Sequence, residues 1–212
     1  MFGATGMVGQ GVLRECLLAD DVHSVLVIGR TPTGQHHPKL REIRHEDFAD
    51  LAPLRAELTG VDACFYCLGV ASLGLDEAAY TRISYTYPLA AARLFAEVSP
   101  TVTFVYVSGA GTDATERGRV MWARVKGRTE NAVLALLPNG YAARPGFIQP
   151  THGVVSKTRW YRLGYALTRP LFPLLRWLLP NQVTATDRLG RAMLRVAREG
   201  SPRRVLANRD LT

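Results

Sequence analysis

Gly3-Ala4-Thr5-Gly6-Met7-Val8-Gly9 is the stretch of sequence that decides the fold. Its three glycines stand three residues apart and open a helical pattern. The first glycine permits a tight turn, the second lets a pyrophosphate approach the backbone, and the third lets helix and strand pack closely. The N-terminus of the helix then faces the phosphates. The motif predicts a dinucleotide site whose cofactor-binding residues include Gly3, Thr5, Gly6, Met7, Val8 and Gly9.

Apolar runs alternate with helical patterns along the rest of the chain. The runs cover residues 24–28, 61–68, 103–107 and 141–143, with a short one at Val205 and Leu206. Helical patterns cover residues 76–98, with an expected kink or restart at Pro88, then residues 119–137, and a last stretch from Thr186 or Asp187 to Gly200. This alternation is typical of a parallel sheet covered by helices on both faces. We therefore predict an α/β, Rossmann-type doubly wound parallel sheet.

Length and composition indicate one globular domain. The chain has 212 residues, of which 47% are hydrophobic and 21% charged, close to the average for globular proteins. We find no secretory signal and no apolar run long enough to span a membrane. Three cysteines are too few for a disulfide framework. The sequence predicts a soluble, cytoplasmic protein whose single domain spans residues 1–212.

The net charge of +8 is concentrated in the second half of the chain. Residues 1–109 carry 8 basic and 12 acidic side chains, whereas residues 110–212 carry 18 and 6. Such an excess suits nucleic acid, an anionic membrane or a phosphorylated ligand, but dispersed basic residues more often form a solvated surface. We find no nucleic-acid motif and expect no nucleic-acid partner.

Residues 157–180 depart from the alternating pattern and form a predicted C-terminal appendage. They mix aromatic residues and leucines with four arginines and three prolines. We interpret the segment as a substrate lid or as an amphipathic piece that contacts a membrane surface, with packing against the core as the alternative.

The residues that follow the expected strand at 24–28 bear on the choice between NAD(H) and NADP(H). An NAD-selective site usually places a carboxylate there for the ribose 2′-hydroxyl, whereas this chain has Arg30-Thr31. A guanidinium is a bidentate partner for a 2′-phosphate, so we predict NADP(H) over NAD(H), the alternative being an exposed loop arginine. Asp47, beside Phe48, either frames the adenine or caps the following turn.

Several segments together resemble the short-chain dehydrogenase/reductase superfamily, in particular its atypical NAD-dependent epimerase/dehydratase-like members such as the Tat-interacting-protein oxidoreductases. The segments are Gly3-x-x-Gly6-x-x-Gly9, Cys67-Leu68-Gly69, Val105-Tyr106-Val107-Ser108-Gly109-Ala110-Gly111, Val125-Lys126-Gly127-Arg128-Thr129-Glu130 and Arg144-Pro145-Gly146. The resemblance implies that Leu68, Gly69 and Pro145 also contact the cofactor. It further implies that Ser108 binds a substrate carbonyl and that Lys126 holds the nicotinamide ribose.

The chain departs from the family at position 122. The family places a proton-donating tyrosine four residues before the lysine, on the same helical face, and Trp122 stands there. An indole N–H donates a hydrogen bond but does not release its proton near neutral pH. Tyr80, Tyr85 and Tyr87 are candidates for a displaced phenol, and Trp122 is alternatively a core aromatic.

The chain also departs from the family at its start. The resemblance implies a central strand before the glycine loop, and only Met1 and Phe2 precede Gly3. We therefore expect a truncated first strand, which would leave backbone groups of the sheet unpaired.

Cysteine and histidine do not predict a metal site. Cys64 and Cys67 are three apart in an expected strand and point to opposite faces, so we expect inert, buried thiols. His36 and His37 lack a third ligand, and His152 stands apart.

Two functions from different classes follow. The first is an NADP-dependent oxidoreductase or epimerase-like enzyme acting on a carbonyl or sugar-like small molecule, with Ser108 and Lys126 in the catalytic site beside Trp122. The second is a non-catalytic NADP(H) sensor that has lost the tyrosine. Trp122 favours the sensor, whereas Ser108 with Lys126 favours the enzyme.

Overall fold

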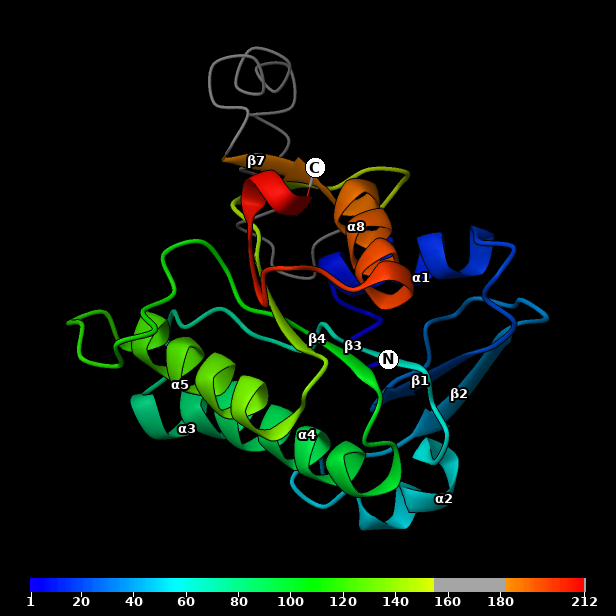
Figure 1. Ribbon diagram of the computed structural model, residues 1–212, viewed down its shortest axis with the longest axis horizontal. Coiled ribbons are helices and arrows are strands. Elements are labelled where there is room, and N and C mark those ends of the chain that lie inside the picture. The colour runs from blue at the N-terminus through cyan, green and yellow to red at the C-terminus, as the bar shows by residue number, and fades with distance from the viewer. Residues whose placement is uncertain (155–181, 212) are drawn as a thin grey trace.

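The computed structural model describes residues 1–154 and 182–211, which form two helical layers around a parallel sheet (Figure 1). The strands are β1 (Val25–Gly29), β2 (Leu40–Arg44), β3 (Ala63–Tyr66), β4 (Thr103–Val107), β5 (Gly140–Arg144), β6 (Phe147–Gln149), β7 (Val183–Ala185) and β8 (Val205–Ala207). The helices are α1 (Met7–Leu18), α2 (Arg55–Leu58), α3 (Glu77–Thr81), α4 (Tyr87–Val98), α5 (Met121–Leu136) and α8 (Thr186–Glu199). Three further helical segments are Ala52–Leu54, Arg82–Thr86 and Asn208–Leu211.

The strands of the main sheet are all parallel. β2 pairs with β1, and β3, β4, β5 and β8 pair in that order. Phe2 joins the two groups, because it bridges Ile28 of β1 and Tyr66 of β3. Its N–H donates to the Phe65 carbonyl over 3.0 Å. The predicted doubly wound parallel sheet is confirmed.

Met1 and Phe2 occupy the centre of the sheet, between β1 and β3. Met1 and Phe2 pair with the carboxyl-terminal halves of β1 and β3. Toward the amino-terminal halves a cavity of about 470 Å³ opens, lined in part by Met1, Leu26 and Ala63. Hydrogen bonds of a parallel ladder alternate in direction, so the N–H groups of Leu26 and Phe65 face this cavity.

Two apolar clusters attach the helices to the sheet. On one face α1 and α8 pack against β1, β4 and β5 through residues such as Leu13, Val105 and Met193. On the other face α2, α4 and α5 pack around Phe104 and Phe95. Figure 1 shows the two pairs, α1 with α8 and α4 with α5, on opposite sides of the strands.

The kink or restart expected at Pro88 takes the form of a restart, because a new α-helix begins at Tyr87. The helical path continues from α3 through a π-helical segment, Arg82–Thr86, into α4, whose first turn contains Pro88. A proline nitrogen cannot donate to the carbonyl four residues earlier, here that of Ser84. That carbonyl instead accepts from the Tyr106 hydroxyl at 3.2 Å and the Thr129 hydroxyl at 2.6 Å. Side chains from β4 and α5 thus replace the missing backbone bond.

Other boundaries shift by little. The helix expected at 119–137 is α5, two residues shorter at its start, and the last helix ends at Gly200, whose φ of 69° suits glycine. β6 and β7 pair in parallel, and three residues each are too few for periodicity to reveal. The predicted appendage, 157–180, lies outside the described residues. Among the described helices, none is both long and apolar enough to cross a membrane.

Candidate functional site

A pocket of about 770 Å³ opens where the parallel strands end. Ligands of open α/β sheets bind at this carboxyl edge. Eight of the predicted site residues line it, namely Gly6, Met7, Val8, Leu68, Gly69, Ser108, Lys126 and Pro145. Gly3, Thr5, Gly9, Arg30, Asp47 and Trp122 do not. The structure thus gathers predicted cofactor and catalytic residues around one cavity.

Gly3 and Gly9 shape the loop that borders the pocket. Gly3 has a φ of 77°, and a Cβ there would lie 2.4 Å from the Leu68 nitrogen. A Cβ on Gly9 would lie 2.0 Å from the Gly3 carbonyl oxygen. Both contacts are with backbone and leave no room for a side chain. Their role is therefore the tight turn and close packing that the sequence predicts for these positions.

Gly6 places the N-terminus of α1 at the pocket. It is the N-cap of α1, and no side chain caps the helix there. The first turn holds no acidic residue. Uncapped N–H groups and the helix dipole favour an anion, and a glycine lets it approach the backbone. These residues fit the pyrophosphate of a dinucleotide, whereas Thr5 is half-buried outside the pocket lining and its carbonyl accepts from the Gln10 side chain at 3.0 Å.

Arg30 follows β1 and its side chain is exposed. The nearby acidic residue of β2, Glu42, accepts hydrogen bonds from the Thr33 backbone and hydroxyl at 2.9 and 2.5 Å. It therefore anchors the loop that follows Arg30.

Asp47 caps a turn in the structure. Its carboxylate accepts from the Ala49 N–H at 3.0 Å, and Asp50 accepts from Ala52 in the same way. Phe48 is buried against Phe2 and Tyr87. The geometry fits the capping alternative better than contact with an adenine.

Ser108 and Lys126 meet at the floor of the pocket. Ser108 follows β4 and is 6% exposed, and its hydroxyl lies 2.5 Å from a Glu130 carboxylate oxygen and 3.0 Å from the Ala143 carbonyl. Lys126, on α5, donates from Nζ to the Ser108 carbonyl at 2.5 Å. Residues 18 positions apart in the chain are therefore in direct contact.

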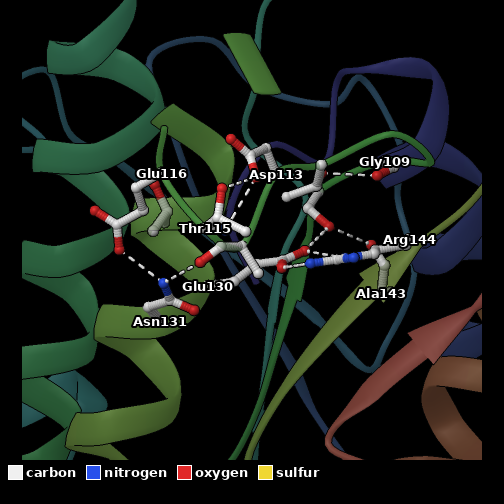
Figure 2. Close-up of polar contacts among 12 residues, drawn as sticks. Gly109, Asp113, Thr115, Glu116, Glu130, Asn131, Ala143 and Arg144 are labelled. Carbon is white, nitrogen blue, oxygen red and sulfur yellow. Dashed lines mark hydrogen bonds and ion pairs between the residues drawn. The ribbon is translucent and has the colours of Figure 1, made fainter. Parts of the chain in front are cut away.

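A buried ion pair supports this floor. Glu130 is 1% exposed and receives hydrogen bonds from the Arg144 guanidinium, with Nε 3.0 and 3.1 Å from its two oxygens and Nη2 at 2.5 Å. Figure 2 shows the carboxylate and the guanidinium facing one another between α5 and β5. A buried carboxylate needs such a partner. Glu130 and Arg144 both stand in segments that carry the family resemblance, but the sequence predicted no role for either. The one signal in the sequence is the i, i+4 spacing of Lys126 and Glu130, which predicts that these two side chains lie close together.

The environment of Lys126 perturbs its acidity. Burial lowers the pKa of its ammonium from 10.5 to about 8, and the Glu130 carboxylate opposes that shift. Glu130 is itself neutralised by Arg144, whose pKa its hydrogen bonds raise. Shifted lysines of this kind are typical of functional sites.

Trp122 lies at the start of α5, outside the pocket lining. Its ring lies against Gly111, where a Cβ would be 3.4 Å from the indole Cη2. The three candidate tyrosines do not line the pocket either. Tyr80 is buried, which raises its pKa, the Tyr85 ring lies 4.1 Å from the Arg128 guanidinium, and Tyr87 packs on Phe48.

Asn208 is a pocket residue that the sequence did not single out. It is 5% exposed, and its Oδ1 accepts from the Gly146 N–H at 2.8 Å. Its Nδ2 is buried and, within the part of the chain described, without an acceptor. An unpaired buried donor that borders a cavity suits a ligand oxygen.

The three cysteines of the chain are held in the neutral thiol form by burial. Burial raises the pKa of Cys16 and Cys64 to about 12 and that of Cys67, which lines the pocket, further still. The prediction of inert thiols fits these shifts. Across residues 1–154 and 182–211, no three His, Cys, Asp or Glu side chains gather as a metal site would require.

Comparison with known proteins gives similarity of structure only. No family model matches the chain, and no curated protein matches it significantly. Among solved structures, the Bordetella bronchiseptica enzyme WbmF in complex with NAD⁺ superposes with a TM-score of 0.69 at 15% identity, covering 97% of this chain and 70% of that one. The dTDP-glucose 4,6-dehydratase DesIV from Streptomyces venezuelae gives 0.69 at 17% identity, covering 99% and 77%.

A short-chain dehydrogenase/reductase from Saccharomyces cerevisiae gives a TM-score of 0.64 at 13% identity, covering 98% of this chain and 94% of that one. At sequence identities this low, the similarity shows the fold and does not identify a substrate. The chain therefore has the Rossmann-type α/β fold shared by NAD-dependent epimerase/dehydratase-like and short-chain dehydrogenase/reductase structures.

Proposed function

We propose that this protein binds NADP(H) and catalyses oxidoreduction, or an epimerase-like reaction, on a carbonyl or sugar-like small molecule. The observation that carries the proposal is the single cavity of about 770 Å³, which joins Gly6 and the N-terminus of α1 to Ser108 and Lys126. A phosphate-binding helix end and a polar catalytic floor are the two parts that a dinucleotide oxidoreductase needs.

In this proposal each residue has a stated role. Gly6, Met7 and Val8 bind the pyrophosphate through the N-terminus of α1, Leu68, Gly69 and Pro145 flank the nicotinamide half, and Arg30 binds the 2′-phosphate. The bound dinucleotide supplies hydride chemistry. The exposed guanidinium after β1, in place of a carboxylate, supports NADP(H) over NAD(H). Structures similar to this one contain NAD⁺, which supports a dinucleotide but leaves the 2′-phosphate to experiment.

The second candidate is a non-catalytic NADP(H) sensor, and Trp122 is the observation that favours it. An indole on the helical face of Lys126 supplies no proton to a substrate. The two candidates share the cofactor site and differ only in turnover.

NADPH oxidation by the purified protein against a panel of aldehydes, ketones and nucleotide sugars tests the proposal. The enzyme reading requires substrate-dependent oxidation, whereas the sensor reading requires NADPH binding by calorimetry without turnover. Failure of both NADPH and NADH to bind would overturn both.

Trp122→Tyr separates the candidates further. A positioned general acid contributes about 10²–10⁴-fold, so a phenol at 122 should raise carbonyl reduction by at least about tenfold if position 122 faces the carbonyl when substrate is bound. Trp122→Phe is the matched control, since it changes the ring without adding an acid. Equal rates for the two variants would show that position 122 does not face the reacting carbonyl.

A further inference from the structure

Lys126 is the one charged side chain that lines the pocket among the residues described. It reaches the cavity from α5, and one of its three N–H groups donates to the Ser108 carbonyl at 2.5 Å. An ammonium has two further protons to offer. A ligand carbonyl in this cavity therefore has a cationic donor within the wall.

Other proton donors are absent from the described wall or already engaged. Trp122 and the candidate tyrosines do not line the pocket. The Ser108 hydroxyl is held by the Glu130 carboxylate and the Ala143 carbonyl, both acceptors. Cys67 lines the pocket, but its thiol pKa lies far above the neutral range.

We propose that Lys126 Nζ is the catalytic proton donor, which protonates the substrate oxygen directly because no tyrosine stands in the described wall. The inference rests on the proposed function. In the reductive direction the carbonyl carbon accepts a hydride, with its electron pair, from the reduced dinucleotide, which leaves oxidised. The carbonyl oxygen takes a proton from the Lys126 ammonium, and the resulting amine regains one from water. The product is the alcohol.

The charged groups around Lys126 suit this role. On α5, Glu130 favours the ammonium, while Arg144 of β5 neutralises that carboxylate and Asp113 in turn acts on Arg144. Cys67, after β3, is neutral. With a pKa of about 8, Lys126 is mostly protonated at pH 7 yet able to release its proton.

The residue type also matters. The chain has 23 arginines and only three lysines, Lys39, Lys126 and Lys157. An arginine at position 126 would keep the positive charge and the hydrogen bond but would not release a proton. Lysine is thus the basic residue that combines binding with proton transfer.

Titration of the lysines tests the acidity without any turnover. Three lysines give three ε-carbon resonances in protein labelled with ¹³C-lysine, assigned through Lys39→Arg, Lys157→Arg and Lys126→Arg. We expect the Lys126 resonance to titrate near pH 8. Titration of Lys126 above pH 10 would overturn the proposal.

Kinetics of Lys126→Arg test the proton transfer. The variant should bind NADPH as the wild type does and lose about 10²-fold or more in kcat, and the wild-type kcat should fall as the pH rises through about 8. Lys39→Arg is the matched control, because Lys39 also donates to a backbone carbonyl, that of Ala19 at 2.7 Å, far from the pocket lining.

The outcomes separate this inference from the proposed function. Wild-type turnover that persists in Lys126→Arg with the same pH profile overturns the role of Lys126 and leaves the oxidoreductase standing. NADPH binding with no wild-type turnover overturns both and leaves the sensor. Loss of NADPH binding in Lys126→Arg assigns the residue to cofactor binding and overturns proton donation.

Discussion

The two halves of the pocket are built from different material. The half proposed to hold the pyrophosphate comes from one continuous stretch, the loop from Gly3 to Gly9, where Gly3 and Gly9 leave no room for a side chain. The catalytic half is made of side chains from three elements, with Ser108 after β4, Lys126 and Glu130 on α5, and Arg144 on β5. The comparison teaches that a local motif can specify a cofactor cradle, whereas a reactive floor depends on long-range packing and on charge.

The largest expected effect breaks the catalytic half. Glu130→Gln removes the carboxylate that holds Ser108 and Arg144, leaving a largely buried guanidinium without its counter-charge. We expect a loss of about 3 kcal/mol in the free energy of unfolding, since breaking a buried pair costs about 3–5 kcal/mol and Arg144 keeps some exposure. Urea denaturation measures it.

Glu116→Gln provides the control for this change. Glu116 pairs with Asn131 at the surface near the same helix (Figure 2), so its loss should cost little. A Glu130→Gln variant as stable as the control would show that the floor does not depend on the ion pair.

The second prediction breaks the cofactor half. Gly9→Ala places a methyl group 2.0 Å from the Gly3 carbonyl oxygen, so the loop must move. Overpacking of this kind costs about 1–3 kcal/mol, and dinucleotide binding should be lost with the loop geometry. Gly60→Ala is the matched control, because its φ of 73° makes the substitution costly to stability while Gly60 lies outside the pocket lining, so NADPH affinity should not change. Calorimetry showing unchanged NADPH affinity in Gly9→Ala would contradict the proposed cradle.

The third prediction sharpens the choice of cofactor. Arg30→Ala removes the guanidinium proposed for the 2′-phosphate and should weaken NADPH by about tenfold or more, since a charge-assisted hydrogen bond contributes about 1.5–3 kcal/mol. NADH affinity should not change. Arg55→Ala, at an exposed pair with Glu97, serves as the control. Equal losses for NADPH and NADH would assign Arg30 to a general role.

The fourth prediction concerns the stability cost of the Lys126 charge. A pKa lowered to about 8 means that the folded state disfavours the ammonium relative to the unfolded state. This penalty is fully present below pH 8 and is relieved as the pH rises toward 10.5, where the unfolded lysine also loses its proton. The stability of the wild type should therefore rise relative to Lys126→Met between pH 8 and 10. Parallel pH curves for the two proteins, from thermal denaturation, would show that Lys126 keeps its ordinary pKa.

The sequence by itself determined the parallel sheet and the cradle, because both depend on local patterns. Apolar runs of strand length, a helical period and three spaced glycines are each read over a few residues. The same is true of Gly200 at the end of α8. The family resemblance predicted that Ser108 and Lys126 belong to one site, and in the structure the Lys126 ammonium donates to the Ser108 carbonyl.

Only the tertiary structure decided how polar groups are satisfied. The Ser84 carbonyl left without a backbone donor by Pro88 accepts hydrogen bonds from the Tyr106 and Thr129 hydroxyls, which the sequence did not predict. Glu130 is paired by Arg144, and Asn208 borders the pocket from the far end of the chain. Each of these contacts depends on groups brought together from different elements. Burial at the same site lowers the pKa of the Lys126 ammonium. The sequence shows which donors, acceptors and charges each residue carries, whereas tertiary packing decides which partner each of these groups contacts.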